Sequence, residues 1–526
     1  MSTTTTLLRS HLCGDWQQGG GETATLFNPT TGEAIGEVAR GGQDLVAALK
    51  YAREIGGPTL RAMSFAERGA LLAAMANAWH GYRNELLDLS TLSGGNTRGD
   101  AKFDIDGGTG TLMTYAKIGE KLGEAKFFID GESIRLSRSP RFVGRHVQTP
   151  RAGVAVHINA YNFPAWGMAE KAACAILAGM PVLTKPATST SLLAERMMQI
   201  LVDEKVLPDG VLQMLVGSAA DLLDHVTGQD VVAFTGSAWT GRTIRSGENV
   251  INNSVRVNVE ADSLNCAVLG PDVKPQKETW DLMVREVTTD MTQKAGQKCT
   301  AIRRIFVPEN MVEEFKQDLK ESISSIRVGN PATRGVRMGP VASASQLKDV
   351  QEGIAELLQE SDIVHGEQGR GELLEVEEGK GYFQAPVLLQ TRDSQAAKLV
   401  HEREVFGPVA TIIPYAGDVS ALGALLNKGE GGLVASVYSD DREFATAHMT
   451  VVAPFNGRLN FGSKKVAEMS MGPGAVLPML VHGGPGRAGA GEELGGLRGM
   501  SLYMQRTALQ GDEPMLAEIM AGGIEI

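Results

Sequence analysis

Short apolar runs rich in β-branched residues alternate with helix-like segments through the second quarter of the chain. Apolar runs of this length are typical of strands buried inside a sheet, and the segments between them are long enough to cross over as helices. The alternation predicts an α/β fold with a doubly wound sheet. The predicted strands are Val154–Ile158, Val182–Thr184, Val211–Val216 and Val231–Phe234, and Leu192–Val202 is a predicted helix.

A second alternation of the same kind runs from Ile305 to Ser439. It contains a helical pattern at Met311–Ile326 and a charged, glycine-rich segment at Gly366–Gly381, which is predicted to be a surface loop. A chain of 526 residues exceeds the size at which one core keeps growing, so a second α/β domain is expected. No low-complexity linker separates the halves, and we expect the domains to be interleaved.

Two further segments have patterns of their own. From Asp44 to Tyr82 apolar residues recur at helical spacing, interrupted at Gly56-Gly57-Pro58, which predicts two helices joined by a turn. From Phe127 to Val147 apolar and polar residues alternate around Asp130-Gly131, the pattern of a β-hairpin. Because exposed strands are rarely left unpaired, we expect this ribbon to pair across subunits with Ser501–Gln510.

The acidic composition narrows the class of partner. The formal net charge is −12, whereas nucleic-acid and anionic-membrane binding favour a basic face, so a small-molecule partner is expected. The four cysteines show no Cys-x-x-Cys spacing, which suits a reducing compartment, and a cytoplasmic location is expected. Met1–Trp16 lacks a secretion-signal pattern, and the longest apolar stretch, Ala172–Leu183, is too short to span a bilayer.

Three residues far apart in the sequence are candidates for one reactive site. Cys299 has the side chain of a nucleophile, Glu260 could act as a general base, and Asn162 could donate a hydrogen bond to an oxyanion. Each also has a structural interpretation. A free cysteine is often a small buried hydrophobe, Glu260 could be a strand-end carboxylate satisfied by backbone amides, and Asn162 could be a turn residue before Phe163-Pro164.

Five motifs occur together with Glu260 in a characteristic order. They are Tyr-Asn-Phe-Pro (161–164), Lys-Pro-Ala-Thr (185–188), Phe-Thr-Gly-Ser (234–237), Ala-Gly-Gln-Lys-Cys-Thr (295–300) and Glu-Val-Phe-Gly-Pro (404–408). In this order they resemble the aldehyde dehydrogenase superfamily over nearly the whole chain. The resemblance implies the aldehyde dehydrogenase fold, with a Rossmann-like dinucleotide domain, a second α/β catalytic domain and a β-ribbon oligomerisation arm.

The same resemblance implies boundaries for these parts. Residues 1–126 and 148–265 would form the dinucleotide-binding domain, 127–147 and 485–526 the oligomerisation arm, and 266–484 the catalytic domain. The chain is expected to form a homodimer or a dimer of dimers.

The resemblance also implies a reaction. Cys299 would attack the carbonyl carbon of an aldehyde, and a hydride would leave the adduct for a nicotinamide dinucleotide. The side-chain amide of Asn162 and the backbone N–H of Cys299 would hold the oxyanion. Glu260 would then activate the water that hydrolyses the remaining thioester to the acid. No metal is expected in this site.

Cofactor residues follow from the same resemblance, because superfamily members bind the dinucleotide without the usual glycine-rich fingerprint. Gly236 and Ser237 match the segment that approaches the pyrophosphate at a helix start. Lys185 matches the lysine near the adenosine ribose, Glu404 the carboxylate that holds the nicotinamide ribose, and Phe406 the aromatic beside the nicotinamide. As plain alternatives, Lys185 could be a solvated charge, Glu404 one of several acids in a turn, and Phe406 a core residue.

Position 188 bears on the choice between NAD and NADP. NAD-preferring relatives commonly carry a glutamate three residues after the lysine, where it binds the ribose 2′-hydroxyl and repels a 2′-phosphate. Here Thr188 follows Lys185 at that spacing, so NADP is favoured and NAD is a second candidate. Gly484–Gly489 fits Gly-x-Gly-x-x-Gly, but too little chain follows for a βαβ unit, so it is predicted to be a turn-rich loop.

Departures from the common pattern point to a subgroup. Ala261–Asn265 stands where many relatives have a double glycine and a lysine, and Tyr161 replaces a frequent tryptophan. With residues 295–304 and 482–489, these segments resemble the semialdehyde dehydrogenases of aerobic CoA-linked aromatic degradation. That subgroup includes the dehydrogenase half of the phenylacetate-pathway ring-opening protein and a stand-alone enzyme of the benzoyl-CoA pathway. The expected substrate is therefore an aliphatic semialdehyde linked to CoA.

The bifunctional type in that subgroup continues into a hydratase-like domain. This chain is thus expected to be either stand-alone or truncated, and a hydratase is a candidate partner. A general aldehyde dehydrogenase and a CoA-acylating dehydrogenase are the alternative enzymes; acylating enzymes commonly lack a base at the position of Glu260, so Glu260 favours hydrolysis. A binding protein that has kept the fold is disfavoured by the presence of Cys299, Glu260 and Asn162.

Overall fold

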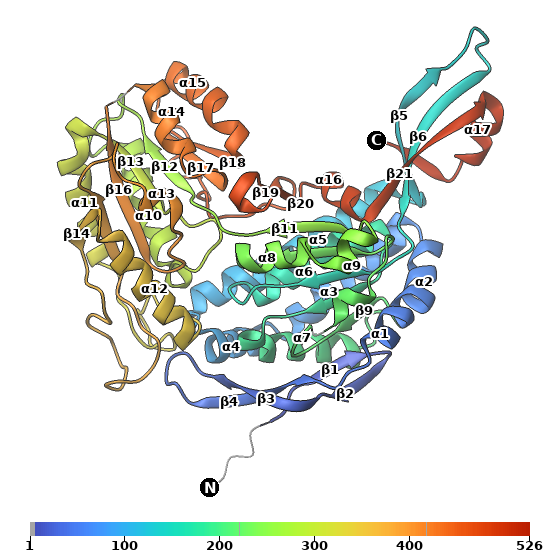
Figure 1. The fold of residues 1–526 in the computed structure, drawn as a ribbon, viewed down its shortest axis with the longest axis horizontal. Coiled ribbons are helices and arrows are strands. Elements are labelled where there is room, and N and C mark those ends of the chain that lie inside the picture. The colour runs from blue at the N-terminus through green and yellow to red at the C-terminus, as the bar shows by residue number, and fades with distance from the viewer. Residues whose placement is uncertain (1–5, 220, 417) are drawn as a thin grey trace.

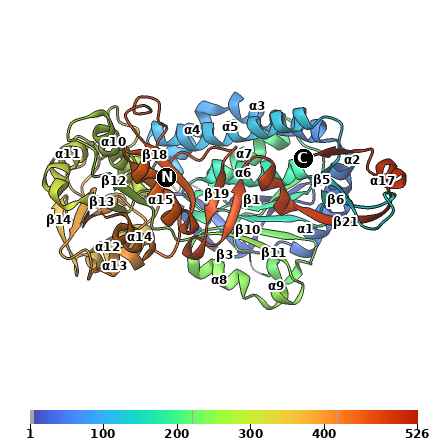
Figure 2. The ribbon, with the colours of Figure 1, turned by 90° about the horizontal axis from the view of Figure 1, so that it is seen from above.

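The structure is a computed structural model that describes residues 6–219, 221–416 and 418–526. Two sheet-containing halves lie side by side, and a β-ribbon arm projects from the end of one of them (Figure 1). The view from above shows the same division, with helices along the outer faces of both sheets (Figure 2). The mixed α/β architecture with a projecting ribbon confirms the predicted fold class.

The first sheet contains the predicted doubly wound arrangement. Its order is β11-β10-β7-β8-β9-β1-β2, with β7 to β11 all parallel and β1 and β2 antiparallel at one edge. The chain passes from β7 to β8 on one side and returns to β10 on the other, and such a reversal opens a crevice at the carboxyl ends of the two strands. The strands are β1 Arg9–Leu12, β2 Asp15–Gln18, β7 Ala155–Ile158, β8 Val182–Lys185, β9 Leu212–Met214, β10 Val231–Thr235 and β11 Arg256–Glu260.

One helix beside this sheet, α6 (Pro164–Ala178), is buried along almost its whole length. Alanine and apolar residues dominate it and favour both helix formation and close packing. Pro164 lies in the first turn, where its missing N–H has no intrahelical partner to lose. Two adjacent charged residues interrupt the apolar sequence, Glu170 and Lys171. Further helices of this half are α3 Phe65–Gly81, α4 Arg83–Gly94, α5 Arg98–Leu122, α7 Ser191–Asp203, α8 Ala238–Arg245 and α9 Glu248–Asn252.

The second sheet has the order β14-β15-β16-β13-β12-β17-β18 and is parallel except for β14. The predicted helix at 311–326 is present as α11, and residues 366–381 contain neither helix nor strand, as expected for a loop. The strands are β12 Cys266–Leu269, β13 Arg304–Pro308, β14 Ser361–His365, β15 Val387–Thr391, β16 Val409–Tyr415, β17 Gly432–Tyr438 and β18 Asn456–Gly462. The helices are α10 Glu278–Thr292, α11 Val312–Ser324, α12 Ala344–Leu357, α13 Leu399–Glu402, α14 Val419–Asn427 and α15 Arg442–Val452.

The arm differs from its prediction in two ways. The hairpin exists, but its turn lies at 136–141, and Asp130-Gly131 is an irregularity of register inside the ribbon. The prediction that the late segment pairs with the ribbon of another subunit is also wrong for β6. The edge of β6 pairs with β21 of the same chain, antiparallel, over nine residue pairs. The arm consists of β5 Phe127–Arg135, β6 Phe142–Pro150, β21 Met504–Asp512, β22 Gly523–Glu525 and helix α17 Glu513–Ile519.

The predicted turn at Gly56-Gly57-Pro58 is also wrong. The backbone stays helical from α1 (Leu45–Tyr51) through a π-helical turn (Ala52–Gly56) into α2 (Gly57–Ala62). The N–H of Gly57 bonds to the carbonyl of Ala52, five residues back, and the wider turn tolerates the proline that follows. The helix breaks instead before α3, where Ser64 and Glu67 form a capping box.

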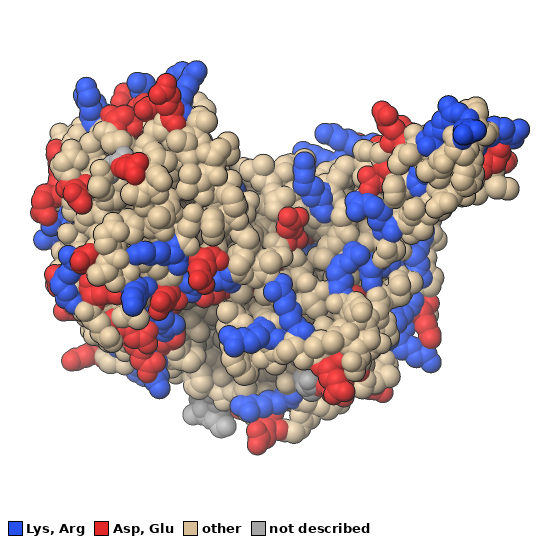
Figure 3. All heavy atoms as spheres, turned by 45° about the horizontal axis from the view of Figure 1, so that its top comes forward, with Lys and Arg blue, Asp and Glu red and all other residues tan. Residues whose placement is uncertain are grey.

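Part of the predicted arm packs elsewhere. Residues 485–503 include β20 (Gly491–Leu494) and α16 (Leu497–Met500), which contact β11 and α6 of the first half. None of the helices in the described ranges combines the length and apolar character that crossing a bilayer requires. Acidic and basic side chains are interspersed over the face in Figure 3, and basic residues gather at the tip of the arm, where Arg135, Arg138 and Arg141 flank or lie in the turn.

Candidate active site

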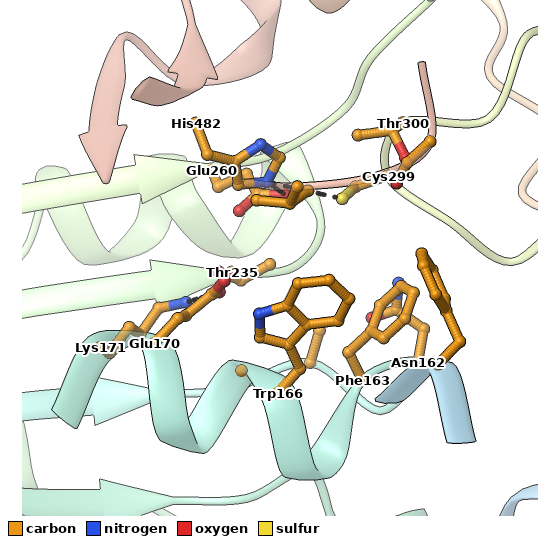
Figure 4. Close-up of a pocket in the computed structure, with 15 residues that line it drawn as sticks. Asn162, Phe163, Trp166, Glu170, Lys171, Thr235, Glu260, Cys299, Thr300 and His482 are labelled. Carbon is orange, nitrogen blue, oxygen red and sulfur yellow. Dashed lines mark hydrogen bonds and ion pairs between the residues drawn. The ribbon is translucent and has the colours of Figure 1, made fainter. Parts of the chain in front are cut away.

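Two adjoining cavities meet at the carboxyl ends of β7, β10 and β11. Five residues line both of them: Ala160, Asn162, Thr235, Glu260 and Cys299. The structure therefore brings the three predicted reactive residues together at the junction, although they are far apart in the sequence. In Figure 4, Cys299 and Glu260 lie on one side of the cavity, and Asn162 faces them from the start of α6.

Cys299 lies in a loop that is tied down by its neighbours. Two non-glycine residues before it, Lys294 and Ala295, have left-handed backbone conformations with φ of 54° and 52°, which cost energy and persist only where the surroundings enforce them. The Asn265 side-chain amide donates to the carbonyls of Cys299 (2.7 Å) and Ala301 (3.0 Å). The position of the thiol is thus set by the loop backbone and by this amide.

The lysine next to Cys299 in sequence does not approach the thiol. Lys298 points to Asp290, with Nζ 2.5 Å from Oδ1, and both side chains are buried. Arg303 donates to the carbonyls of Gly296 (2.9 Å) and Lys298 (3.3 Å), which fixes the other end of the loop. The cation nearest in sequence is therefore unavailable to stabilise a thiolate.

Asn162 is held against the loop that carries Cys299. Its Nδ2 donates to the carbonyl of Gln297 at 3.1 Å, and Gln297 in turn donates to the Tyr161 hydroxyl at 2.9 Å. Tyr161 donates to Gln346 at 2.7 Å. Tyr161, which stands where many relatives have a tryptophan, therefore links the segment after β7 to the Cys299 loop by hydrogen bonds.

Glu260 ends β11 with its side chain only 3% exposed. Its Oε1 lies 3.2 Å from Nε2 of His482, which is on β19 (Val481–Gly484). Burial opposes ionisation of Glu260, but the contact with His482 and the charge of Lys171 lower its pKa to about 2. Burial and the nearby Glu260 carboxylate raise the pKa of the Cys299 thiol well above its ordinary value.

Sequence reasoning missed a buried ion cluster behind Glu260. Lys171 pairs with Glu170 at 3.3 Å and with Glu493 at 3.2 Å, and its side chain is 1% exposed. Burial alone would lower the pKa of Lys171, but the two carboxylates raise it. Burial raises the pKa of Glu170 to about 7. A charged pair inside the otherwise apolar α6 sequence was a signal that could have pointed to this cluster.

His482 was also missed as a site residue. The sequence marked it only as part of the motif at 482–489, and nothing in the local pattern shows that its ring reaches Glu260. That motif forms the hairpin between β19 and β20, which confirms the predicted turn-rich loop. The hairpin thus places His482 in the lining of the smaller cavity, most of whose other lining residues come from distant parts of the chain.

The larger cavity holds most of the predicted cofactor residues. It measures about 1420 Å³ including its open mouth, and Gly236, Ser237, Glu404 and Phe406 line it. Ser237 caps the N-terminus of α8 by accepting the N–H of Thr240. Lys185 and Thr188 are not among its lining residues, but Ala187 between them is.

The polar groups of this cavity fit a polar ligand. Two buried polar atoms at strand ends, Asn159 Oδ1 and Thr235 Oγ1, have no hydrogen-bond partner within the described ranges. The backbone N–H of Ser263 donates to Glu404 at 3.2 Å, and burial raises the pKa of Glu404 to about 8. Unsatisfied buried groups of this kind are costly unless a ligand or water meets them.

The segment that departs from the common pattern, 261–265, connects the two halves of the site. Arg487 from the hairpin turn pairs with Asp262 and donates to the carbonyls of His401 and Glu402, just before Glu404. The unusual aspartate therefore has a specific partner, and the pair ties the end of β11 to the segment that carries Glu404.

The similarity to known proteins extends over nearly the whole chain. The model of the aldehyde dehydrogenase family matches residues 16–508. The chain is 44% identical over 478 residues, 91% of its length and 93% of the relative, to 3,4-dehydroadipyl-CoA semialdehyde dehydrogenase from Aromatoleum evansii. It is 27% identical over 494 residues, 93% of its length and 95% of the relative, to a putative aldehyde dehydrogenase of Staphylococcus aureus strain USA300.

Solved structures share the fold. Betaine aldehyde dehydrogenase from Staphylococcus aureus in complex with NAD⁺ has a TM-score of 0.82 at 24% identity, covering 96% of this chain and 95% of that one. Lactaldehyde dehydrogenase from Escherichia coli has a TM-score of 0.83 at 22% identity, covering 96% of this chain and 99% of that one.

Proposed function

Because the chain belongs to the aldehyde dehydrogenase family, we propose that Cys299, Glu260 and Asn162 are the residues with which it oxidises aldehydes to acids. It is an NAD(P)-dependent aldehyde dehydrogenase. The observation that carries the assignment of roles is that these three side chains line both cavities at their junction. A nucleophile, a base and an amide donor at one point are what the reaction requires.

The mechanism follows from the position of each group. The thiolate of Cys299 attacks the aldehyde carbon, and the Asn162 amide, held 3.1 Å from the carbonyl of Gln297, donates to the resulting oxyanion. Gly236, Ser237, Glu404 and Phe406 in the larger cavity would hold a nicotinamide dinucleotide, which would supply the acceptor for the hydride that leaves when the oxyanion collapses. Glu260 then accepts a proton from the water that attacks the thioester, and Cys299 departs as the leaving group.

The remaining cofactor assignments are proposals of the same kind. Gly236 and Ser237 precede α8, whose N-terminal amides favour a pyrophosphate. Glu404 and Phe406 line the cavity and are assigned to the nicotinamide ribose and ring. Lys185 and Thr188 are assigned to the adenosine ribose on the family resemblance and on their position beside Ala187.

The proposed preference for NADP can be tested at Thr188. We expect Thr188→Glu to shift the ratio of kcat/KM for NADP and NAD towards NAD by at least about tenfold, because a carboxylate repels the 2′-phosphate and accepts from the 2′-hydroxyl. Dissociation constants for both dinucleotides, measured by titration, should move in the same direction. Thr188→Gln is the matched control, since it adds similar bulk without charge. An unchanged ratio in the glutamate variant would remove Thr188 from the site.

The proposed substrate is an aliphatic semialdehyde linked to CoA. The support is the 44% identity to a dehydrogenase whose name specifies such a substrate, together with an apolar lining of the smaller cavity by Phe103, Phe163, Trp166 and Val476. A general aldehyde dehydrogenase is the second candidate, because the same lining would accept a free aliphatic chain. A CoA-acylating activity is disfavoured by Glu260, which serves hydrolysis.

A pair of kinetic measurements tests the substrate. We expect a six-carbon CoA-linked semialdehyde to have a kcat/KM at least about tenfold above that of hexanal, because a remote handle adds binding energy in the transition state. Reduced-cofactor absorbance follows both reactions, and addition of free CoA to the hexanal assay controls for binding of the handle alone. Equal efficiency of the two aldehydes would leave the general aldehyde dehydrogenase as the better description.

The assembly and domain roles are also proposals. We assign residues 1–126 and 148–265 to dinucleotide binding, 266–484 to catalysis, and the projecting ribbon to contact between subunits of a homodimer or a dimer of dimers. Support for the last assignment is that the ribbon extends away from both halves (Figure 1). A hydratase that acts on the same CoA-linked intermediate is the proposed partner.

A further inference from the structure

A histidine lies between the proposed nucleophile and the proposed base. His482 Nε2 is 3.2 Å from Glu260 Oε1 and 3.8 Å from Cys299 Sγ. Its side chain is 5% exposed, so solvent screens neither contact strongly. Figure 4 shows the three side chains together on one side of the cavity. One ring nitrogen therefore faces both a carboxylate and a sulfur atom.

This geometry restricts the state of the ring. A neutral imidazole that lacks hydrogen on Nε2 would direct a lone pair at the Glu260 carboxylate, which is repulsive at this separation. With hydrogen on Nε2, the same nitrogen can donate to the carboxylate and to a sulfur anion. The observed contacts are thus those of a donor between two acceptors.

The charges around His482 favour its cationic form. Glu260 on β11 and Glu170 on α6 favour the cation, whereas Arg458 on β18 and burial oppose it. Lys171 on α6 is engaged by Glu170 and Glu493. The balance raises the pKa of His482 above its ordinary value, chiefly through Glu260 acting against burial.

Cys299 needs such a neighbour. Burial and the Glu260 carboxylate both disfavour a thiolate at this position, yet only the thiolate is an effective nucleophile. The adjacent Lys298 is held by Asp290, and the Arg303 guanidinium is bonded to loop carbonyls. Two of the described side chains that line the smaller cavity make hydrogen-bond contacts with the sulfur: Glu260, whose charge disfavours the thiolate, and His482, whose Nε2 lies 3.8 Å from it and can favour the thiolate.

We propose that His482 is a further catalytic residue, which as an imidazolium anchored by Glu260 donates from Nε2 to the Cys299 sulfur and stabilises the thiolate. The S–H bond breaks and its proton passes to solvent water, while His482 keeps its N–H bond at Nε2, so one proton moves and no oxidant or reductant is required. Glu260 holds the ring in place and keeps it charged. The inference rests on the proposed function only in that Cys299 is taken to be the nucleophile.

The test is the pH profile of Cys299 alkylation in the enzyme without aldehyde or dinucleotide. Iodoacetamide reacts with the thiolate, and modification of Cys299 is quantified by peptide mass spectrometry, so the readout does not depend on turnover. We expect His482→Gln and His482→Phe to raise the apparent pKa of the reaction by about one to two units. Because a more basic thiolate is also more nucleophilic, the net fall in rate near neutral pH should be about three- to tenfold.

The two variants separate charge from shape. Glutamine keeps a hydrogen-bond donor but carries no charge, whereas phenylalanine keeps the ring volume without a donor. His448→Phe is the control, since His448 is buried on α15 and stacks on Phe444 away from both cavities. At strongly alkaline pH all variants should react at wild-type rates or faster. A wild-type alkylation profile in either His482 variant would overturn the proposal.

A direct titration separates a change of pKa from other effects on reactivity. The ultraviolet absorbance of the thiolate is titrated in the wild type and in His482→Gln, and Cys299→Ala identifies the part due to Cys299. Burial and Glu260 raise the wild-type midpoint above the value of about 8.5 for a free cysteine, and we expect the midpoint of His482→Gln to be higher still. The same midpoint in both proteins would overturn the proposal. This outcome is distinct from failure of the proposed function, which would appear as residual turnover in Cys299→Ala.

Discussion

Cys299→Ala should abolish aldehyde oxidation and leave dinucleotide affinity unchanged. The thiol stands at the junction of the two cavities, and without it the adduct from which a hydride departs cannot form. Loss of a covalent nucleophile typically costs several orders of magnitude, so kcat should fall by at least about a thousandfold. The measurement is reduced-cofactor formation at saturating aldehyde, with the dissociation constant of the dinucleotide determined by titration on the same preparation.

Cys266→Ala is the matched control for this variant. Cys266 is a second buried thiol, on β12, and it does not line either cavity. It should retain wild-type kcat, since its sulfur packs in the core of the second half. Turnover above about a hundredth of wild type in Cys299→Ala would contradict the assignment of the nucleophile.

Glu260→Gln should separate the two halves of the reaction. Hydride transfer precedes the task of the base, so the first turnover should release a burst of reduced cofactor close to one per site. Hydrolysis of the thioester should then slow by about a hundred- to ten-thousandfold, the usual range for a general base. Stopped-flow absorbance gives the burst, and mass spectrometry of the quenched enzyme should show the acyl group on Cys299.

Two results check this interpretation. Addition of a small amine or thiol nucleophile should speed deacylation in Glu260→Gln, because such a group attacks the thioester without help from the carboxylate. Because Glu260 also raises the pKa of His482, the burst rate near neutral pH should fall less than the steady-state rate but should not stay at the wild-type value. If burst and steady state fell by the same factor, Glu260 would act before hydride transfer and not in hydrolysis.

The strand pattern was readable from local sequence. The four predicted strands and the predicted helix of the first half are present. Each strand is a short apolar run whose side chains are buried inside the sheet, and such runs are typical of parallel sheets covered on both faces. Turns were less readable. Gly56-Gly57-Pro58 looks like a break, but Gly56 lies against Gly210, where a Cβ would come within 2.0 Å of the Gly210 carbonyl oxygen, so close packing explains the glycine.

The ordered motifs likewise identified the family and predicted residues that the fold brings together. Cys299, Glu260 and Asn162 meet at one point, and four of the six cofactor residues predicted from the resemblance line the adjoining cavity. Lys185 and Thr188 are not among the lining residues, and their roles stay predictions. Motifs predict site residues because members of the family place a given chemical group at the end of a given strand.

The sequence by itself determined the fold class and the family and predicted the three reactive residues, since each depends on periodicity or on a contiguous motif. Only the tertiary structure decided what surrounds them. His482 reaches Cys299 across 183 positions, and Glu493 reaches Lys171 across 322. Those contacts arise because the hairpin of β19 and β20 folds back onto β11 and α6. The protonation of the site depends on such contacts, because the charge of a buried group is set by its neighbours in space and not by its neighbours in the chain.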